Sequence, residues 1–186
     1  AFQATKDHWN LHIAVEDSRV VTYRSDGAKE LISSDILKFL ASKRTKLTYS
    51  PAYSPELNSI IERNHRTIFE MAHAMLLQAN LPLYFWEDAV RYASLIFNSL
   101  PTTTSSGWMP PITAKYGIIP DLSVYKIFGC IVYVHIPKET RSKGFVDKAY
   151  RGFFLGINLK TSTYMGYVIE LDKVVDDSSM IFDETM

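Results

Sequence analysis

The sequence predicts an α/β protein followed by a small β-barrel. Residues 19–24 form a β-branched and aromatic run typical of a strand. Between Glu56 and about Ala79, apolar residues recur at helical spacing, whereas beyond Pro120 the chain consists of short β runs separated by glycines and charged turns. We therefore expect an α/β part over residues 1–110, a linker over 111–119 and a β domain over 120–186.

The first elements are short. Residues 2–15 space a few apolar side chains at helical intervals, which indicates a short helix. The strand over residues 19–24 ends at a Ser-Asp-Gly turn. Ser33 or Ser34 can then cap a helix whose apolar face is Ile36, Leu37 and Leu40. Residues 46–50 are a second strand candidate.

Two longer helices follow. The prolines in residues 51–55 predict irregular backbone, because each disfavours helix in the residue before it. Residues 56–79 predict a helix of about 36 Å. Residues 84–98 carry a broad apolar stripe and predict a second helix. The stretch 101–111, rich in Thr, Ser, Gly and Pro, has the composition of a linker, and a short helix is expected over 112–116.

The carboxy-terminal part is expected to be β-rich. Its apolar and β-branched runs are short, and turn residues separate them at regular intervals, which favours a small barrel. The predicted strands are Ile127–Ile136, Gly152–Ile157, Tyr164–Leu171 and Ser179–Phe182.

Composition and charge limit the classes of function. Hydrophobic residues make up 47% of the chain, which indicates a packed globular protein and not a disordered one. The net charge is zero, yet residues 38–66 carry a balance of +4, residues 138–151 one of +3, and the stretch from Glu170 onward one of −5. Such segregation can present basic faces to phosphate, although solvated surface charge explains each cluster equally well. The single cysteine excludes an intrachain disulfide and a thiolate zinc site.

Two carboxylates stand out by position. Asp26 directly follows the first predicted strand, and Glu62 lies in the first turns of the long helix, with thirty-five residues between them. Carboxylates from a strand end and a nearby helix can converge on hard divalent cations, which can then activate an oxygen for attack on phosphorus. An Asp–Glu pair alone is more often ordinary surface charge, so the surrounding sequence decides.

That sequence resembles copia-type retrotransposon integrases of the retroviral integrase superfamily. The interval between Asp26 and Glu62 matches the D-D-35-E pattern of that superfamily. The motifs that carry the resemblance occur in order along the chain: Thr22–Glu30, Tyr53-Ser54-Pro55 with Asn58, Glu62–Thr67, Leu81-Pro82, Phe85-Trp86, Ala89-Val90, Asn98, Pro120–Ser123, Phe128-Gly129-Cys130, Pro137-Lys138-Glu139, Arg141-Ser142-Lys143, Phe154-Leu155-Gly156, Gly166-Tyr167 and Phe182-Asp183-Glu184.

The resemblance implies a truncated RNase H-like integrase core followed by a small SH3-like β-barrel. Asp26 and Glu62 match the second and third catalytic carboxylates, and both would be ligands of Mg²⁺ or Mn²⁺. The implied reaction is metal-dependent polynucleotidyl transfer, by 3′-end processing and strand transfer. The implied partners are the DNA of the element ends and of the target, together with further copies of the chain in an intact integrase, and no membrane. The implied location is the nucleus or a cytoplasmic particle inside the cell.

The chain departs from the family pattern in ways that bear on activity. The first catalytic Asp should lie several tens of residues before Asp26, and Asp7 and Asp17 are both too close to it. Gly27-Ala28-Lys29 also replaces the usual Asn-Gly-Gly. We therefore expect the chain alone to lack strand-transfer activity. The alternatives are a non-catalytic module that binds nucleic acid or self-associates, and a fragment that does not fold alone.

Basic residues near the two carboxylates are candidates for DNA contact. In the long helix, Arg66 can either contact phosphate or pair with Glu62 one turn earlier. The basic residues after the short helix can equally well interact with the partial negative charge at the carboxyl end of that helix. Those of the β domain can belong to a solvated hairpin. The candidates are Arg63, Asn64 and Arg66, then Lys43 and Arg44, then Lys138, Arg141 and Lys143.

Overall fold

A computed structural model describes most of the chain as two compact units, residues 1–64 and residues 65–186. Each unit is considered by itself. The residues described are 3, 6, 20–25, 33–49, 59–104, 106–137 and 147–185. The helix expected over residues 2–15 therefore lies outside the described residues, apart from two positions.

The first unit contains a β–α–β element. Strand β1 (Thr22–Ser25) pairs in parallel with β2 (Lys46–Tyr49), and helix α2 (Ser34–Ser42) connects them. Ile36 and Leu40 of the helix are almost completely buried. They pack against apolar side chains that include residues in the two strands and next to them. Leu37, expected on the same apolar face, is 40% exposed, because it lies one residue round the helix from the buried stripe.

Helices dominate the middle of the chain. Helix α3 (Ser59–Ala79) occupies most of the predicted long helix, and its 21 residues span about 31 Å. A 3-10 turn, η4 (Leu83–Phe85), leads directly into α4 (Trp86–Ser99). Within the described parts of the chain, no helix combines the length and apolar character needed to cross a membrane.

The stretch expected to be a linker has regular structure. Strands β3 (Thr102–Thr104) and β4 (Gly107–Met109) form a short antiparallel hairpin, and helix α5 (Pro111–Tyr116) follows at once. The Thr104 hydroxyl donates to the Gly107 carbonyl oxygen at 2.7 Å across the turn. The composition therefore indicated a turn correctly but not the three-residue strands on either side of it.

The carboxy-terminal part forms a five-stranded antiparallel sheet in the order β8-β7-β6-β5-β9. A short 3-10 turn, η5 (Leu122–Val124), precedes it, and another, η7 (Ile169–Leu171), lies between β7 and β8. The strands are β5 (Ile131–His135), β6 (Ala149–Asn158), β7 (Thr163–Val168), β8 (Lys173–Asp177) and β9 (Ile181–Asp183). The predicted α/β part followed by a β-rich domain is confirmed, whereas β8 was not predicted.

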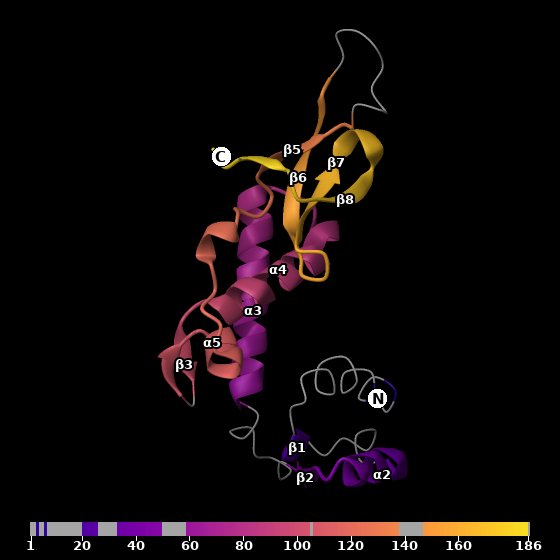
Figure 1. The fold of residues 1–186 in the computed structure, drawn as a ribbon, viewed down its shortest axis with the longest axis vertical. Coiled ribbons are helices and arrows are strands. Elements are labelled where there is room, and N and C mark those ends of the chain that lie inside the picture. Colours follow the sequence, from indigo (N-terminus) through magenta and orange to yellow (C-terminus); the bar gives the residue numbers. More distant parts are fainter. Residues whose placement is uncertain are drawn as a thin grey trace. The chain divides into compact units, whose positions relative to one another are not determined.

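The helices and this sheet share one hydrophobic core. Figure 1 shows α4 lying against β6 and α3 ending beside the sheet. Ala89, Tyr92 and Ala93 of α4 are buried in the same cluster as Phe154 and Leu155 of β6. The apolar stripe of α4 is therefore covered by the sheet as well as by α3, and residues 65–186 form a single packed unit.

Tyr92 connects α4 to the segment that leads into the sheet. Its ring is 2% exposed and packs edge-on against Phe154, with the ring centroids 5.3 Å apart. Its hydroxyl donates to the Lys126 carbonyl oxygen at 2.7 Å and accepts from the Lys126 backbone N–H at 2.9 Å. Burial raises the pKa of the Tyr92 phenol well above its ordinary value of 10.0.

We expect Tyr92→Phe to lower the free energy of unfolding by about 1–3 kcal/mol, because the Lys126 peptide groups lose their partner. Because the pKa of the Tyr92 phenol is higher in the folded protein, the unfolded chain loses the phenol proton at a lower pH than the folded chain does. The stabilisation that the hydroxyl provides is therefore complete below about pH 10 and decreases as the pH rises further. Urea unfolding at pH 7 and at pH 10.5 measures both effects. The gap between the two proteins should narrow at the higher pH; a gap of constant size would contradict the assignment.

Candidate functional site

The two parallel strands of the first unit end at the same edge. Ser25, the last residue of β1, lies opposite Tyr49, the last residue of β2. The carboxyl ends of neighbouring parallel strands are where α/β folds place ligand-binding residues. Asp26 follows Ser25 directly in the chain, as the sequence predicted, but Asp26 itself lies outside the described residues.

Glu62 lies in the first turn of α3 with its side chain exposed to solvent. The negative charge suits that place, because the partial positive charge of the helix dipole is concentrated there. Among the residues described, no ion pair joins Glu62 to Arg66, although the two are one turn apart.

The described residues do not form a metal centre by themselves. Within them, no group of three or more His, Cys, Asp or Glu side chains is placed so that it could hold a metal ion. Glu62 supplies one oxygen donor of the kind that Mg²⁺ and Mn²⁺ prefer. The convergence of Asp26 and Glu62 on one cation stays a prediction.

The candidate DNA contacts on α3 are largely accessible. Arg63 and Arg66 are exposed, and Asn64 is partly buried. Arg66 follows Glu62 at i+4 and lies about 40° round the helix from it, and Arg63 lies about 100° round in the same direction, so both basic groups lie to one side of the carboxylate. This face can approach a phosphate backbone, and contact with DNA stays a prediction.

Lys43 and Arg44 lie at the carboxyl end of α2 and are also exposed. Arg44 adopts a left-handed conformation with φ 54°; its N–H donates to the Ala41 carbonyl oxygen and that of Thr45 to the Leu40 carbonyl oxygen. This is a Schellman motif, so the backbone of Arg44 terminates the helix and its side chain is left to solvent. The backbone conformation of Arg44 is thus explained by the end of the helix, without DNA. Contact of its side chain with phosphate stays a prediction.

The three basic candidates of the β domain, Lys138, Arg141 and Lys143, lie outside the described residues. They fall between β5 and β6, which are adjacent strands of the sheet. Contact of these residues with DNA stays a prediction.

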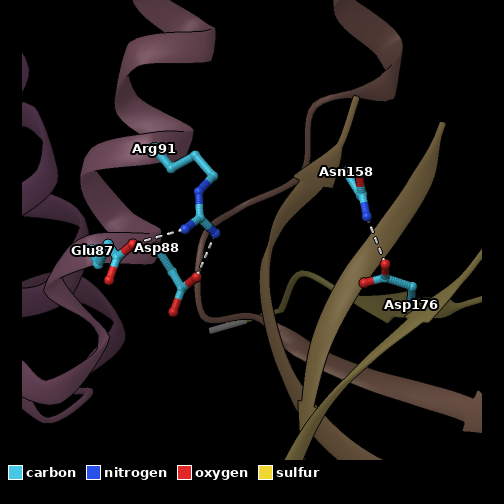
Figure 2. Close-up of polar contacts among 5 residues, drawn as sticks. All are labelled: Glu87, Asp88, Arg91, Asn158 and Asp176. Carbon is cyan, nitrogen blue, oxygen red and sulfur yellow. Dashed lines mark hydrogen bonds and ion pairs between the residues drawn. The ribbon is translucent and has the colours of Figure 1, made fainter. Parts of the chain in front are cut away.

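A mainly apolar cavity with polar side chains in its walls, which the sequence analysis did not single out, lies between α4 and β6. It measures about 370 Å³, and Asp88, Arg91 and Asn158 are among the side chains that line it. Arg91 pairs with Glu87 at 3.1 Å and with Asp88 at 3.0 Å, as Figure 2 shows. Burial raises the pKa of Asp88, and the neighbouring Arg91 opposes that shift.

On the sheet side of the same cavity, the Asn158 amide donates to the Asp176 carboxylate at 2.7 Å (Figure 2). Arg91 and Asn158 are thus each paired with acids of their own wall. The acids at i−4 and i−3 from Arg91 were a signal for the first pair, whereas the Asn158–Asp176 contact joins β6 to β8 and leaves no local trace in the sequence.

Comparison with known families identifies the end of the chain. Residues 130–186 match the family described as "Retroviral polymerase SH3-like domain". The match covers β5 to β9, so the β-rich part is an SH3-like domain, as predicted.

Relatives extend the similarity over most of the chain. It is 29% identical over 167 residues to the Retrovirus-related Pol polyprotein from transposon RE2 of Arabidopsis thaliana, covering 90% of this chain. It is 29% identical to the corresponding polyprotein from transposon TNT 1-94 of Nicotiana tabacum, covering 87% of this chain. These matches confirm the predicted resemblance to copia-type retrotransposon Pol polyproteins. The chain spans only 11% and 12% of the lengths of these two relatives.

Among solved structures, the catalytic core domain of HTLV-2 integrase in complex with magnesium is similar to the chain with a TM-score of 0.43 and 19% identity. The similarity covers 59% of this chain and 67% of that one.

Proposed function

We propose that this chain, which is similar to the integrase-related region of retrotransposon Pol polyproteins, binds DNA for integration through the first turns of α3. The observation that carries the proposal is the exposed part of α3 on which Arg63 and Arg66 lie to one side of Glu62, within the Glu62–Thr67 motif. Phosphate contacts supply most of the affinity of such faces and position the duplex.

The same proposal assigns chemistry to the two carboxylates. Asp26 and Glu62 would hold Mg²⁺ or Mn²⁺, which would stabilise charge on the phosphodiester oxygens when bound. Glu62 would bring its carboxylate from the helix, and Asp26 would bring its own from the end of β1. Arg63 and Arg66 would orient the DNA backbone beside them. We further propose the domain limits predicted from the sequence, with the core ending at residue 110 and the β domain beginning at residue 120.

Binding of a fluorescent duplex by the full chain tests this function. We expect the affinity for DNA to fall with rising salt concentration. The double variant Arg63→Glu with Arg66→Glu should reduce the slope of log affinity against log salt concentration by about 2, which corresponds to two lost phosphate contacts. Lys160→Glu with Lys173→Glu, at exposed positions of the carboxy-terminal sheet, changes the net charge by the same amount and is the matched control, which should change the slope less. Equal effects of the two variants would remove α3 from the interface.

A joining assay with labelled donor, supercoiled target and Mn²⁺ tests catalysis separately. We expect no joined product from the 186-residue chain, since it offers two of the three carboxylates that the reaction needs. DNA binding that survives Asp26→Ala with Glu62→Ala and produces no joining would instead support the non-catalytic module. Clear joining by the isolated chain would refute the expected inactivity.

A further inference from the structure

A groove on the second unit combines exposed aromatic rings with carboxylates. It measures about 920 Å³ and lies between the η4 turn and the outer strands of the sheet. Tyr84 and Trp86 are 82% and 50% exposed there, which is unusual for such large rings. We call this the aromatic groove; its lining residues are Leu81, Pro82, Tyr84, Phe85, Trp86, Glu87, Asp88, Phe153, Tyr167, Ile169, Asp172, Lys173 and Val174.

The rings of the aromatic groove form a fixed row. Phe85 is 5% exposed, and its ring packs edge-on against Tyr84 at 5.3 Å and against Tyr167 at 5.2 Å between centroids. The Tyr167 hydroxyl donates to the Asp172 carboxylate. The buried Phe85 ring thus packs against the more accessible rings of Tyr84 and Tyr167. The hydrogen bond from Tyr167 to Asp172 holds the end of the row that lies on the sheet.

The charge of the aromatic groove selects the class of occupant. Its lining holds three carboxylates, on Glu87, Asp88 and Asp172, and one ammonium group, on Lys173. Arg91 pairs with two of these acids, and the balance of the lining together with Arg91 is still negative. A phosphate backbone would be repelled here, whereas lysine and arginine side chains would meet both carboxylates and aromatic faces.

We propose that the aromatic groove binds an extended, basic peptide segment of a protein partner. The occupant is extended because β8, whose Lys173 and Val174 line the groove, is one of the two edge strands of the sheet among the described residues, and sheet edges and aromatic rows recognise extended chains. This interaction is independent of the proposed DNA function, which depends on α3 and on a different set of charges.

A peptide of roughly ten residues with alternating lysine and proline is a suitable probe, because it is extended without needing a pairing strand. Peptides with glutamate or serine in place of lysine, and a DNA duplex, are the comparison probes. We expect the full chain to bind the lysine peptide in fluorescence anisotropy and to bind the glutamate and serine peptides at least about tenfold more weakly.

Variants at exposed positions test the location without disturbing the fold. Tyr84→Ala with Glu87→Gln should weaken lysine-peptide binding by about tenfold, since both a cation–π contact and a carboxylate are lost. Trp108→Ala with Glu70→Gln removes an equally exposed ring and acid elsewhere and should leave binding within about twofold. Both variants should stay folded, with thermal midpoints within a few degrees of the parent chain, because all four side chains are exposed and the lost Tyr84–Phe85 and Glu87–Arg91 contacts lie at the surface.

The contrary outcomes are distinct. Undetectable binding at millimolar peptide, or equal binding of the glutamate peptide, would overturn the proposal. Self-association of the chain that disappears in Tyr84→Ala with Glu87→Gln would replace the peptide partner by a second copy, and this too would overturn it. Displacement of the lysine peptide by duplex DNA in the parent chain and in Arg63→Glu with Arg66→Glu alike would place DNA in the groove and would also overturn the proposal.

Discussion

Gly129→Ala is expected to destabilise the protein by about 4 kcal/mol, a large part of the ~5–15 kcal/mol that holds a domain folded. Gly129 has φ 76°, and a Cβ atom added to it would lie 2.3 Å from the Ala79 Cβ at the end of α3. The N–H of Gly129 also donates to the Phe154 carbonyl oxygen at 2.8 Å, so the glycine cannot move away without breaking a contact with the sheet. Chemical unfolding followed by circular dichroism measures the loss.

Gly117→Ala is the matched control for this prediction. Gly117 has nearly the same backbone conformation, with φ 72°, but no atom lies within 4 Å of the position of an added Cβ. It should therefore cost only the left-handed strain of about 1–2 kcal/mol. Ala79→Gly introduced together with Gly129→Ala should restore about 1–2 kcal/mol, because it removes the clashing atom. Equal losses at the two glycines would show that α3 does not pack against Gly129.

The elements that the sequence predicted are those whose periodicity is strong and local. Helix α3 and helix α4 correspond to apolar repeats, and β1 overlaps the strand predicted over residues 19–24 at residues 22–24. Strand β8 was missed because its sequence is charged at three of its five residues and it lies at the sheet edge, where side chains need not alternate between core and solvent. The β3–β4 hairpin was missed because strands of three residues carry too little pattern.

The candidate site was predictable only in part. The exposure of Glu62, Arg63 and Arg66 follows from their place on the polar side of an amphipathic helix, and the position of Asp26 follows from the end of β1. The distance between the two carboxylates depends on long-range packing, which no local pattern encodes. The aromatic groove shows the same limit: the run Tyr84-Phe85-Trp86 does not by itself indicate that Phe85 is buried whereas Tyr84 is 82% exposed.

An amphipathic stripe also does not reveal its partner. The apolar face of α4 would suit a helical neighbour alone, and no local pattern indicates that the sheet covers it too. Phe154 of β6 lies where the two meet. It is fully buried, and Tyr92 of α4 and Phe182 of β9 pack edge-on against its ring, with centroid separations of 5.3 and 5.4 Å. The α3–α4 helices and the SH3-like sheet should therefore unfold together.

Phe154→Ala should consequently lower the free energy of unfolding by about 3–5 kcal/mol, through lost burial and the cavity left among the rings. Tyr133→Ala on β5, where the side chain is 38% exposed, should cost markedly less. Hydrogen exchange distinguishes a shared core from an autonomous sheet. If the core is shared, Phe154→Ala lowers the protection of α4 amides as much as that of β6 amides, because both open in the same global event. Protection that falls in the sheet while α4 keeps its own would mean that the helices are stable without it.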